Sequence, residues 1–282
     1  MLPETNSFIE RQRLRQLTRK ESGTDESVGN VFVREGKVAI KRHWALLSYL
    51  VLLMAGFNFM SHGSQDLYPT MLESQLEFNP NQITVTQVVA NLGAMVGGTV
   101  VGFGSQSIGR RFSIIVCCIV GGALLYPYGF VRDNSIMAAA FFQQFCVQGA
   151  WGVIPIHLME LSPGAFRTFV VGTSYQLGNL VSSASSTIEA RLGERYPLAD
   201  SEDGEKRYDY GKVIAIFMAA VYIYVILLTF LGPENLRRKF DVEHDDDARE
   251  VAGEETVRRT RGEQREAAME RKISDPEKLE GR

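Results

Sequence analysis

Six long apolar stretches constrain this chain more than any other feature of its sequence. They cover residues 44–62, 82–104, 112–131, 135–159, 168–188 and 213–232. A helix rises ~1.5 Å per residue and the hydrocarbon core of a bilayer is ~30 Å thick, so each stretch is long enough to span a membrane. Because backbone polar groups in lipid must be satisfied internally, such stretches fold as helices. The sequence therefore predicts an all-α integral membrane protein with six transmembrane helices.

The charged residues lie mostly at the two ends of the chain and set the expected domains and topology. Residues 1–42 form a basic segment, residues 43–232 hold the six-helix bundle, and residues 233–282 form a charged tail with too few apolar residues to build a core. The tail is expected to be disordered. Arg110, Arg111 and Arg167 follow the second and fourth spans, whereas residues 63–81 contain no Lys or Arg. By the positive-inside rule, both termini are cytosolic.

Small and amide residues predict that the spans pack into one bundle. In the second span, Gly93 with Gly97 and Gly98 with Gly102 have the four-residue spacing that lets helix backbones approach closely. Several amides also fall inside the spans: Gln87, Asn91, Gln143, Gln144, Gln148, Gln176 and Asn179. Buried amides need partners from each other, from water or from a ligand.

The spans show no pattern typical of an enzyme or a metal site. Cys117, Cys118 and Cys146 lie inside predicted spans, and their spacing resembles neither a metal site nor a disulfide framework. We expect them to be small packing residues. No nucleophile–base pair is evident either, so an enzymatic function is not expected.

A dense run of polar residues from Asn58 to Thr70, called the polar run below, follows directly on the first apolar stretch. On a helix, five of its side chains share one face: Asn58, Ser61, His62, Gln65 and Asp66. Ionisable residues at membrane depth usually mark a substrate or proton path. His62 and Asp66 could share a proton, while Asn58, Ser61, Ser64 and Gln65 could donate hydrogen bonds to a carboxylate. The alternative is an external helix end whose polar residues merely meet water.

Polar residues outside the polar run also have expected roles. Gln176 and Asn179 are three residues apart in the fifth span and could bind a second side of a carboxylate, although amides in membrane helices more often join helices. His157 and Glu160 are expected to form a structural or gating cluster with Arg167. Four tyrosines are predicted to lie at membrane interfaces: Tyr68, Tyr126, Tyr128 and Tyr222.

The spacing N-x-x-S-H-x-S-Q-D-x-x-x-T is complete from Asn58 to Thr70. It resembles the signature of the fungal Jen family of monocarboxylate:proton symporters, within the major facilitator superfamily. The resemblance implies that this segment corresponds to the seventh of twelve transmembrane helices. It also implies that the polar residues of the segment handle substrate and protons: Asn58, Ser61, His62, Ser64, Gln65, Asp66 and Thr70. The segment Ser174–Asn179 similarly resembles the family's eleventh helix, where Gln176 and Asn179 would recognise substrate.

A second resemblance lies in the sequence GFGSQSIGRR, residues Gly102–Arg111, called the arginine loop below. It is similar to the loop motif G-x-x-x-D-R-x-G-R-R between the eighth and ninth helices of the superfamily. Gln106 and Ser107 replace the usual acidic and basic residues. This departure argues against a gate based on charge relay at the loop.

The resemblance extends over about residues 35–235 and accounts for helices seven to twelve only. It implies the carboxy-terminal half of a proton-coupled transporter of lactate, pyruvate or acetate in the plasma membrane. The proton would be the coupling ion, with no other cofactor. The expected partners are a monocarboxylate, membrane lipid, and an amino-terminal half or intact homologue; nucleic acid is not expected.

Three explanations of the half-length resemblance stay open: a truncated gene model, a degenerate copy, or a true half-size protein. The alternative function is a non-transporting interaction or regulatory protein that assembles with an intact homologue.

Overall fold

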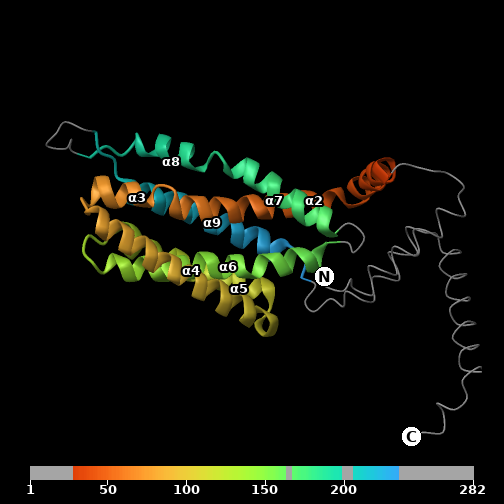
Figure 1. Ribbon diagram of the computed structural model, residues 1–282, viewed down its shortest axis with the longest axis horizontal. Helices are drawn as coiled ribbons and strands as arrows, with labels where there is room; N and C mark the ends of the chain where they lie inside the picture. The colour runs from red at the N-terminus through yellow and green to blue at the C-terminus, as the bar shows by residue number, and fades with distance from the viewer. Residues whose placement is uncertain (1–27, 163–166, 199–205, 235–282) are drawn as a thin grey trace, which may run out of the picture. The chain divides into compact units, whose positions relative to one another are not determined.

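The computed structural model describes residues 28–162, 167–198 and 206–234, and these residues are nearly all helical. The elements are α2 (Val28–Gln65), α3 (Tyr68–Thr70), the π-helical turn η1 (Met71–Gln75), α4 (Pro80–Ile108), α5 (Arg110–Phe130), α6 (Ile136–Leu161), α7 (Arg167–Ser182), α8 (Ser185–Gly193) and α9 (Tyr210–Leu231) (Figure 1). Within the described ranges the only strand-like pairing is an isolated bridge between Pro197 and Tyr208. The predicted all-α fold class is confirmed.

The first predicted span is the carboxy-terminal part of α2. Helical dihedral angles are interrupted at His43 (φ −113°, ψ 24°), next to the predicted boundary between basic segment and bundle. The helix ends at Gln65, and Pro69 explains why. A proline at this position has no N–H to donate to the carbonyl of Gln65, and its ring crowds that carbonyl. Residues 1–27 of the predicted basic segment and residues 235–282 of the predicted tail lie outside the described residues.

Four helices of the described chain are long and apolar enough to cross a membrane. They are the segment His43–Gln75 and the helices α4, α5 and α9. The other two predicted spans are also helical. The fourth is α6, whose glutamines lower its hydropathy. The fifth is divided between α7 and α8, with a turn at Ser183 and Ala184.

Helix α6 lies at the centre of one side of the bundle. It packs along α4 and α5, and α5 in turn packs along α9. Figure 1 shows α8 on the opposite side of α3 and α9 from α4 and α6. The polar run of α2 contacts α6 through Gln65 and Gln144, and it lies against α7 where Asn58 meets Gly178.

The glycines of the second span lie against a neighbouring helix, as predicted, and that helix is α6. A side chain at Gly97 would collide with the backbone carbonyl of Phe145. A Cβ atom at Gly102 would lie 3.0 Å from the carbonyl oxygen of Gly152. Only residues without a Cβ let two helix backbones approach this closely.

The three cysteines are buried, and their thiols are free. Cys117 and Cys118 come from α5 and Cys146 comes from α6. This is the packing role predicted for them.

Candidate functional site

The residues of the polar run lie in and between two helices, and they differ in how deeply they are buried. Asn58 and Ser64 are buried in α2, and Ser61, His62 and Gln65 are half-buried. Asp66 is exposed and directly follows the helix. Thr70 is half-buried in α3, beyond the break that Pro69 imposes. Helical periodicity therefore holds through Gln65, but Thr70 does not share the helix.

His62 and Asp66 form the contact predicted from their spacing. His62 Nδ1 lies 3.2 Å from one carboxylate oxygen of Asp66 and 3.4 Å from the other. Both side chains are reached by solvent, with 42% and 37% of their surfaces exposed. The two side chains are therefore within hydrogen-bond reach of each other and accessible to water.

Ser64 and Gln65 join α2 to its neighbouring helices. Gln65 Nε2 donates to Oε1 of Gln144 in α6 at 3.0 Å, and Gln144 Nε2 donates to the hydroxyl of Ser64 at 3.2 Å. The hydroxyl of Tyr128 in α5 donates to the carbonyl oxygen of Ser64 at 2.5 Å. A ligand that binds the amide of Gln65 would have to compete with Gln144.

The prediction that four tyrosines lie at membrane interfaces is wrong for three of them. Only Tyr126 is exposed, with 72% of its surface accessible. Tyr68 and Tyr128 are buried and stack with ring centroids 4.1 Å apart. Tyr222 is buried, and its hydroxyl accepts a hydrogen bond from Gln143. Each of the three rings fills space between helices, which spacing along a single helix cannot reveal.

Asn58 lies where α2 and α7 approach each other. A Cβ atom at Gly178 would lie 2.9 Å from Nδ2 of Asn58 and 2.8 Å from Cβ of Met54. Asn58 is 3% exposed, yet its Nδ2 has no hydrogen-bond partner among the described residues. Asn179, the residue after Gly178, is half-buried, whereas Gln176 is exposed. Of the two amides predicted on the fifth span, Asn179 is adjacent in sequence to the contact with α2.

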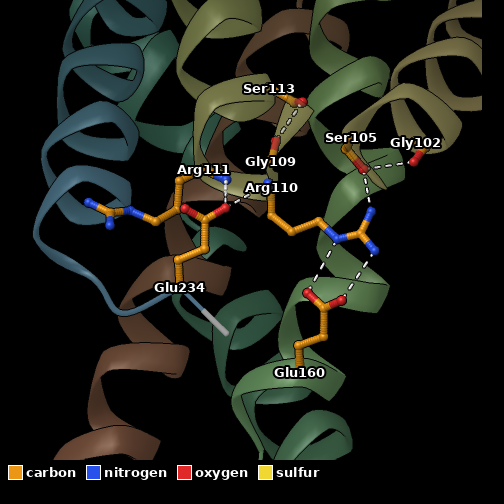
Figure 2. Close-up of polar contacts among 8 residues, drawn as sticks. All are labelled: Gly102, Ser105, Gly109, Arg110, Arg111, Ser113, Glu160 and Glu234. Atoms are coloured by element: carbon orange, nitrogen blue, oxygen red, sulfur yellow. Dashed lines mark hydrogen bonds and ion pairs between the residues drawn. The ribbon is translucent and has the colours of Figure 1, made fainter. Parts of the chain in front are cut away.

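The arginine loop forms a second polar cluster, shown in Figure 2. Arg110 is 4% exposed and pairs with the buried Glu160 of α6. Its Nε and Nη2 atoms each donate to a different oxygen of Glu160 at 3.2 Å. Its Nη1 atom donates to the hydroxyl of Ser105 at 2.5 Å. The ends of α4, α5 and α6 are thereby held together.

Arg111 and Glu234 connect the same loop to the end of α9. Arg111 Nε donates to the carbonyl oxygen of Thr229 at 2.7 Å, and Arg111 Nη2 donates to that of Phe230. The first residue of α5 follows Gly109, which has no side chain to cap the helix. Glu234 supplies the cap instead, because its carboxylate accepts from the backbone N–H groups of Arg110 and Arg111 (Figure 2). Charges are thus organised at this loop despite the substitutions at positions 106 and 107.

The residues of the predicted cluster lie at the end of α6 and the start of α7: His157, Glu160 and Arg167. Arg167 donates to the carbonyl oxygen of Met159 at 3.1 Å, and Glu160 accepts from Arg110 as described above. His157 is fully buried, and neither ring nitrogen has a hydrogen-bond partner among the described residues.

Sequence reasoning missed one buried ionisable residue, Glu189, which lies in α8. The predicted fifth span ended at residue 188, just before it. The signal that could have revealed it is a glutamate directly after the uncharged residues 168–188.

Comparison with known proteins gives one family and two curated relatives. The profile of the family described as "Sugar (and other) transporter" matches residues 6–242. The chain is 40% identical over 245 residues to a "Carboxylic acid transporter protein homolog" of Saccharomyces cerevisiae, covering 84% of this chain and 40% of that protein. It is 29% identical over 132 residues to a "Cis,cis-muconate transport protein" of Acinetobacter baylyi, covering 45% of this chain and 32% of that protein.

A solved structure supports the same fold. The xylose transporter XylE from E. coli, in a partially occluded inward-open conformation, is similar with a TM-score of 0.51 and 14% sequence identity. The similarity covers 80% of this chain and 59% of XylE. The chain spans about two fifths of the length of the yeast relative and about a third of the length of the bacterial one.

Proposed function

Because this chain belongs to the sugar (and other) transporter family, a family of membrane transporters, we propose that it is the carboxy-terminal half of a proton-coupled monocarboxylate transporter. Lactate, pyruvate and acetate are the proposed substrates. The relatives support the carboxylate class, since one is named for carboxylic acids and the other for cis,cis-muconate, a dicarboxylate. The complete polar run from Asn58 to Thr70 supports the choice of monocarboxylates, through its resemblance to the symporter signature.

The observation that carries the proposal is the unpartnered amide of Asn58. A buried hydrogen-bond donor without an acceptor costs about 1–3 kcal/mol. A carboxylate that accepts from Nδ2 of Asn58 would remove this cost. Because Gly178 lies against this atom, the anion would bind beside the contact between α2 and α7. Asn179 and Gln176 would then complete its recognition.

The proton is proposed to move through His62 and Asp66. Their contact of 3.2 Å and their exposure to solvent allow exchange with water. A proton on this pair would reduce the negative charge that an arriving carboxylate meets.

Transport is expected only when the other six helices are supplied. A major facilitator binds substrate between two halves and rocks one against the other. The residues described above would form one side of such a cavity. The amino-terminal half could come from a fusion with the yeast relative or from co-expression.

The experiment is uptake of labelled lactate by vesicles that contain the completed transporter, with a proton gradient directed inward. His62→Ala and Asp66→Asn should each strongly lower uptake at unchanged protein levels. Asn58→Ala, Gln65→Ala, Gln176→Ala and Asn179→Ala should chiefly raise the apparent KM. Asn91→Ala is the matched control, because the exposed amide of Asn91 donates only to its own helix, at the carbonyl of Gln87.

Two results would contradict the proposal. Uptake that keeps its pH dependence in both the His62 and Asp66 variants would show that the polar run is structural. Absence of uptake in every pairing, together with inhibition of an intact homologue, would favour a regulatory protein instead.

A further inference from the structure

Glu189 is a buried carboxyl group without a partner. None of its surface is exposed, and neither carboxylate oxygen has a hydrogen-bond partner among the described residues. It lies in α8, one residue beyond the predicted fifth span and five residues before the exposed Glu194. An ionised carboxylate in such a place costs several kcal/mol unless a cation or hydrogen-bond donors stabilise it.

The polar groups around Glu189 connect it to the end of the polar run. The carboxyl group of Glu189 lies within electrostatic range of the carboxylate of Asp66 and the hydroxyl of Tyr128. Tyr68 stacks on Tyr128, and its hydroxyl is buried without a hydrogen-bond partner in the described chain. The hydroxyl of Ser185, one turn before Glu189, is also buried without a hydrogen-bond partner among the described residues. Glu189 therefore lies near Asp66, at the end of the polar run.

Within the described residues, the groups that interact electrostatically with Glu189 are Asp66, which follows α2, and Tyr128 in α5, and neither is a cation. Tyr210, at the start of α9, lies near Gly193, one turn further along α8. On α8 itself, Arg191 is exposed and pairs with Glu194. Lys212 of α9 lies over the ring of Tyr196.

The protonated form of Glu189 is the stable one in this conformation. Burial, with the carboxylate of Asp66 acting in the same direction, disfavours the charged form of Glu189. Movement of α8 away from the end of α2 would admit water and favour release of the proton. A site that holds a proton when closed and releases it when open has the property that coupled transport requires.

We propose that Glu189 binds the transported proton when the site is closed and exchanges it with the His62–Asp66 pair. This inference rests on the proposed function, since it names the proton-binding residue of the same site. The proton moves between a carboxylate oxygen of Asp66 and one of Glu189, and no other bond changes. With Glu189 protonated, one negative charge fewer repels the carboxylate substrate, so protonation favours substrate binding.

The first test measures protonation directly, on the full chain in lipid nanodiscs without any substrate. Infrared spectra across pH report protonated carboxyl groups through their carbonyl stretching band. The wild type should keep such a band at neutral pH, where a solvated glutamate with a pKa of ~4.3 has lost its proton. Glu189→Gln should remove that component, and Glu194→Gln should leave it intact. Identical titrations of wild type and Glu189→Gln would overturn the proposal.

The second test measures coupling in the completed transporter. Glu189→Gln should abolish lactate accumulation driven by a proton gradient, and Glu189→Asp should recover it because it restores a carboxyl group. Accumulation by Glu189→Gln with the pH dependence of wild type, or failure of Glu189→Asp to recover it, would overturn the proposal. If the wild type takes up no carboxylate at all, the proposed function fails, whereas the infrared titration still decides whether Glu189 holds a proton.

Discussion

The buried ion pair between Arg110 and Glu160 offers the most quantitative test of the fold. We expect Glu160→Gln to destabilise the chain by about 3–5 kcal/mol, the usual cost of breaking a buried pair by removing one partner. The structure supports a value in this range. Both side chains are about 5% exposed, and two parallel N–H···O contacts of 3.2 Å join them. Arg110 cannot lose its charge, so the variant leaves a buried guanidinium with an amide and Ser105 as acceptors.

The measurement is reversible unfolding of the purified chain in detergent, followed by a fluorescence signal. Glu194→Gln is the matched control. It removes the charge from an exposed pair with Arg191, at 3.8 Å, and should cost less than about 1 kcal/mol. The double variant Arg110→Met with Glu160→Leu should recover most of the loss, because apolar residues of similar volume often replace a buried pair without cost.

The reasoning is refuted if Glu160→Gln costs no more than Glu194→Gln. Such a result would mean that water reaches the pair, or that the ends of α4, α5 and α6 are not held together as Figure 2 shows. A double variant less stable than Glu160→Gln would also contradict it, since packing rather than charge would then dominate at this position.

Three further predictions concern packing, pH and topology. Gly97→Leu should impair folding and surface expression, because its side chain would collide with the backbone of α6. Gly104→Leu is the control, since a Cβ atom at that position meets nothing within 4 Å. Equal surface expression of the two variants would argue against close packing of α4 on α6. The melting temperature of the chain should fall as pH rises above the range in which a free glutamate loses its proton, because buried Glu189 retains a proton that the unfolded chain has lost. Glu189→Gln should flatten this slope, and an unchanged slope would assign it to other groups. Glycosylation tags at both termini should stay unmodified, as cytosolic termini require, whereas modification of a tag after Arg282 would exclude the predicted topology.

Much of the fold could be predicted from the sequence, because each span is defined by its own composition. The apolar stretch at 82–104 became α4, and that at 112–131 became α5. The break between α7 and α8 was not predicted. The residues there are serines and alanine, which carry no charge and leave the hydropathy profile continuous.

From the sequence, only those contacts of the candidate site that lie within one helix could be predicted. The contact between His62 and Asp66 follows from helical spacing alone, and it was found. The contacts of Gln65 with Gln144 and of Ser64 with Tyr128 join residues 79 and 64 positions apart, so no local pattern could reveal them. Such contacts depend on which helices become neighbours.

The central claim is symport of a carboxylate with a proton, and one measurement tests it most directly. Vesicles that contain the completed transporter and an internal pH indicator would receive lactate, or xylose as a control, from outside. The account predicts that lactate acidifies the interior faster than it does in protein-free vesicles, that xylose does not, and that Asp66→Asn removes the difference. Lactate entry without acidification beyond that of protein-free vesicles would contradict it.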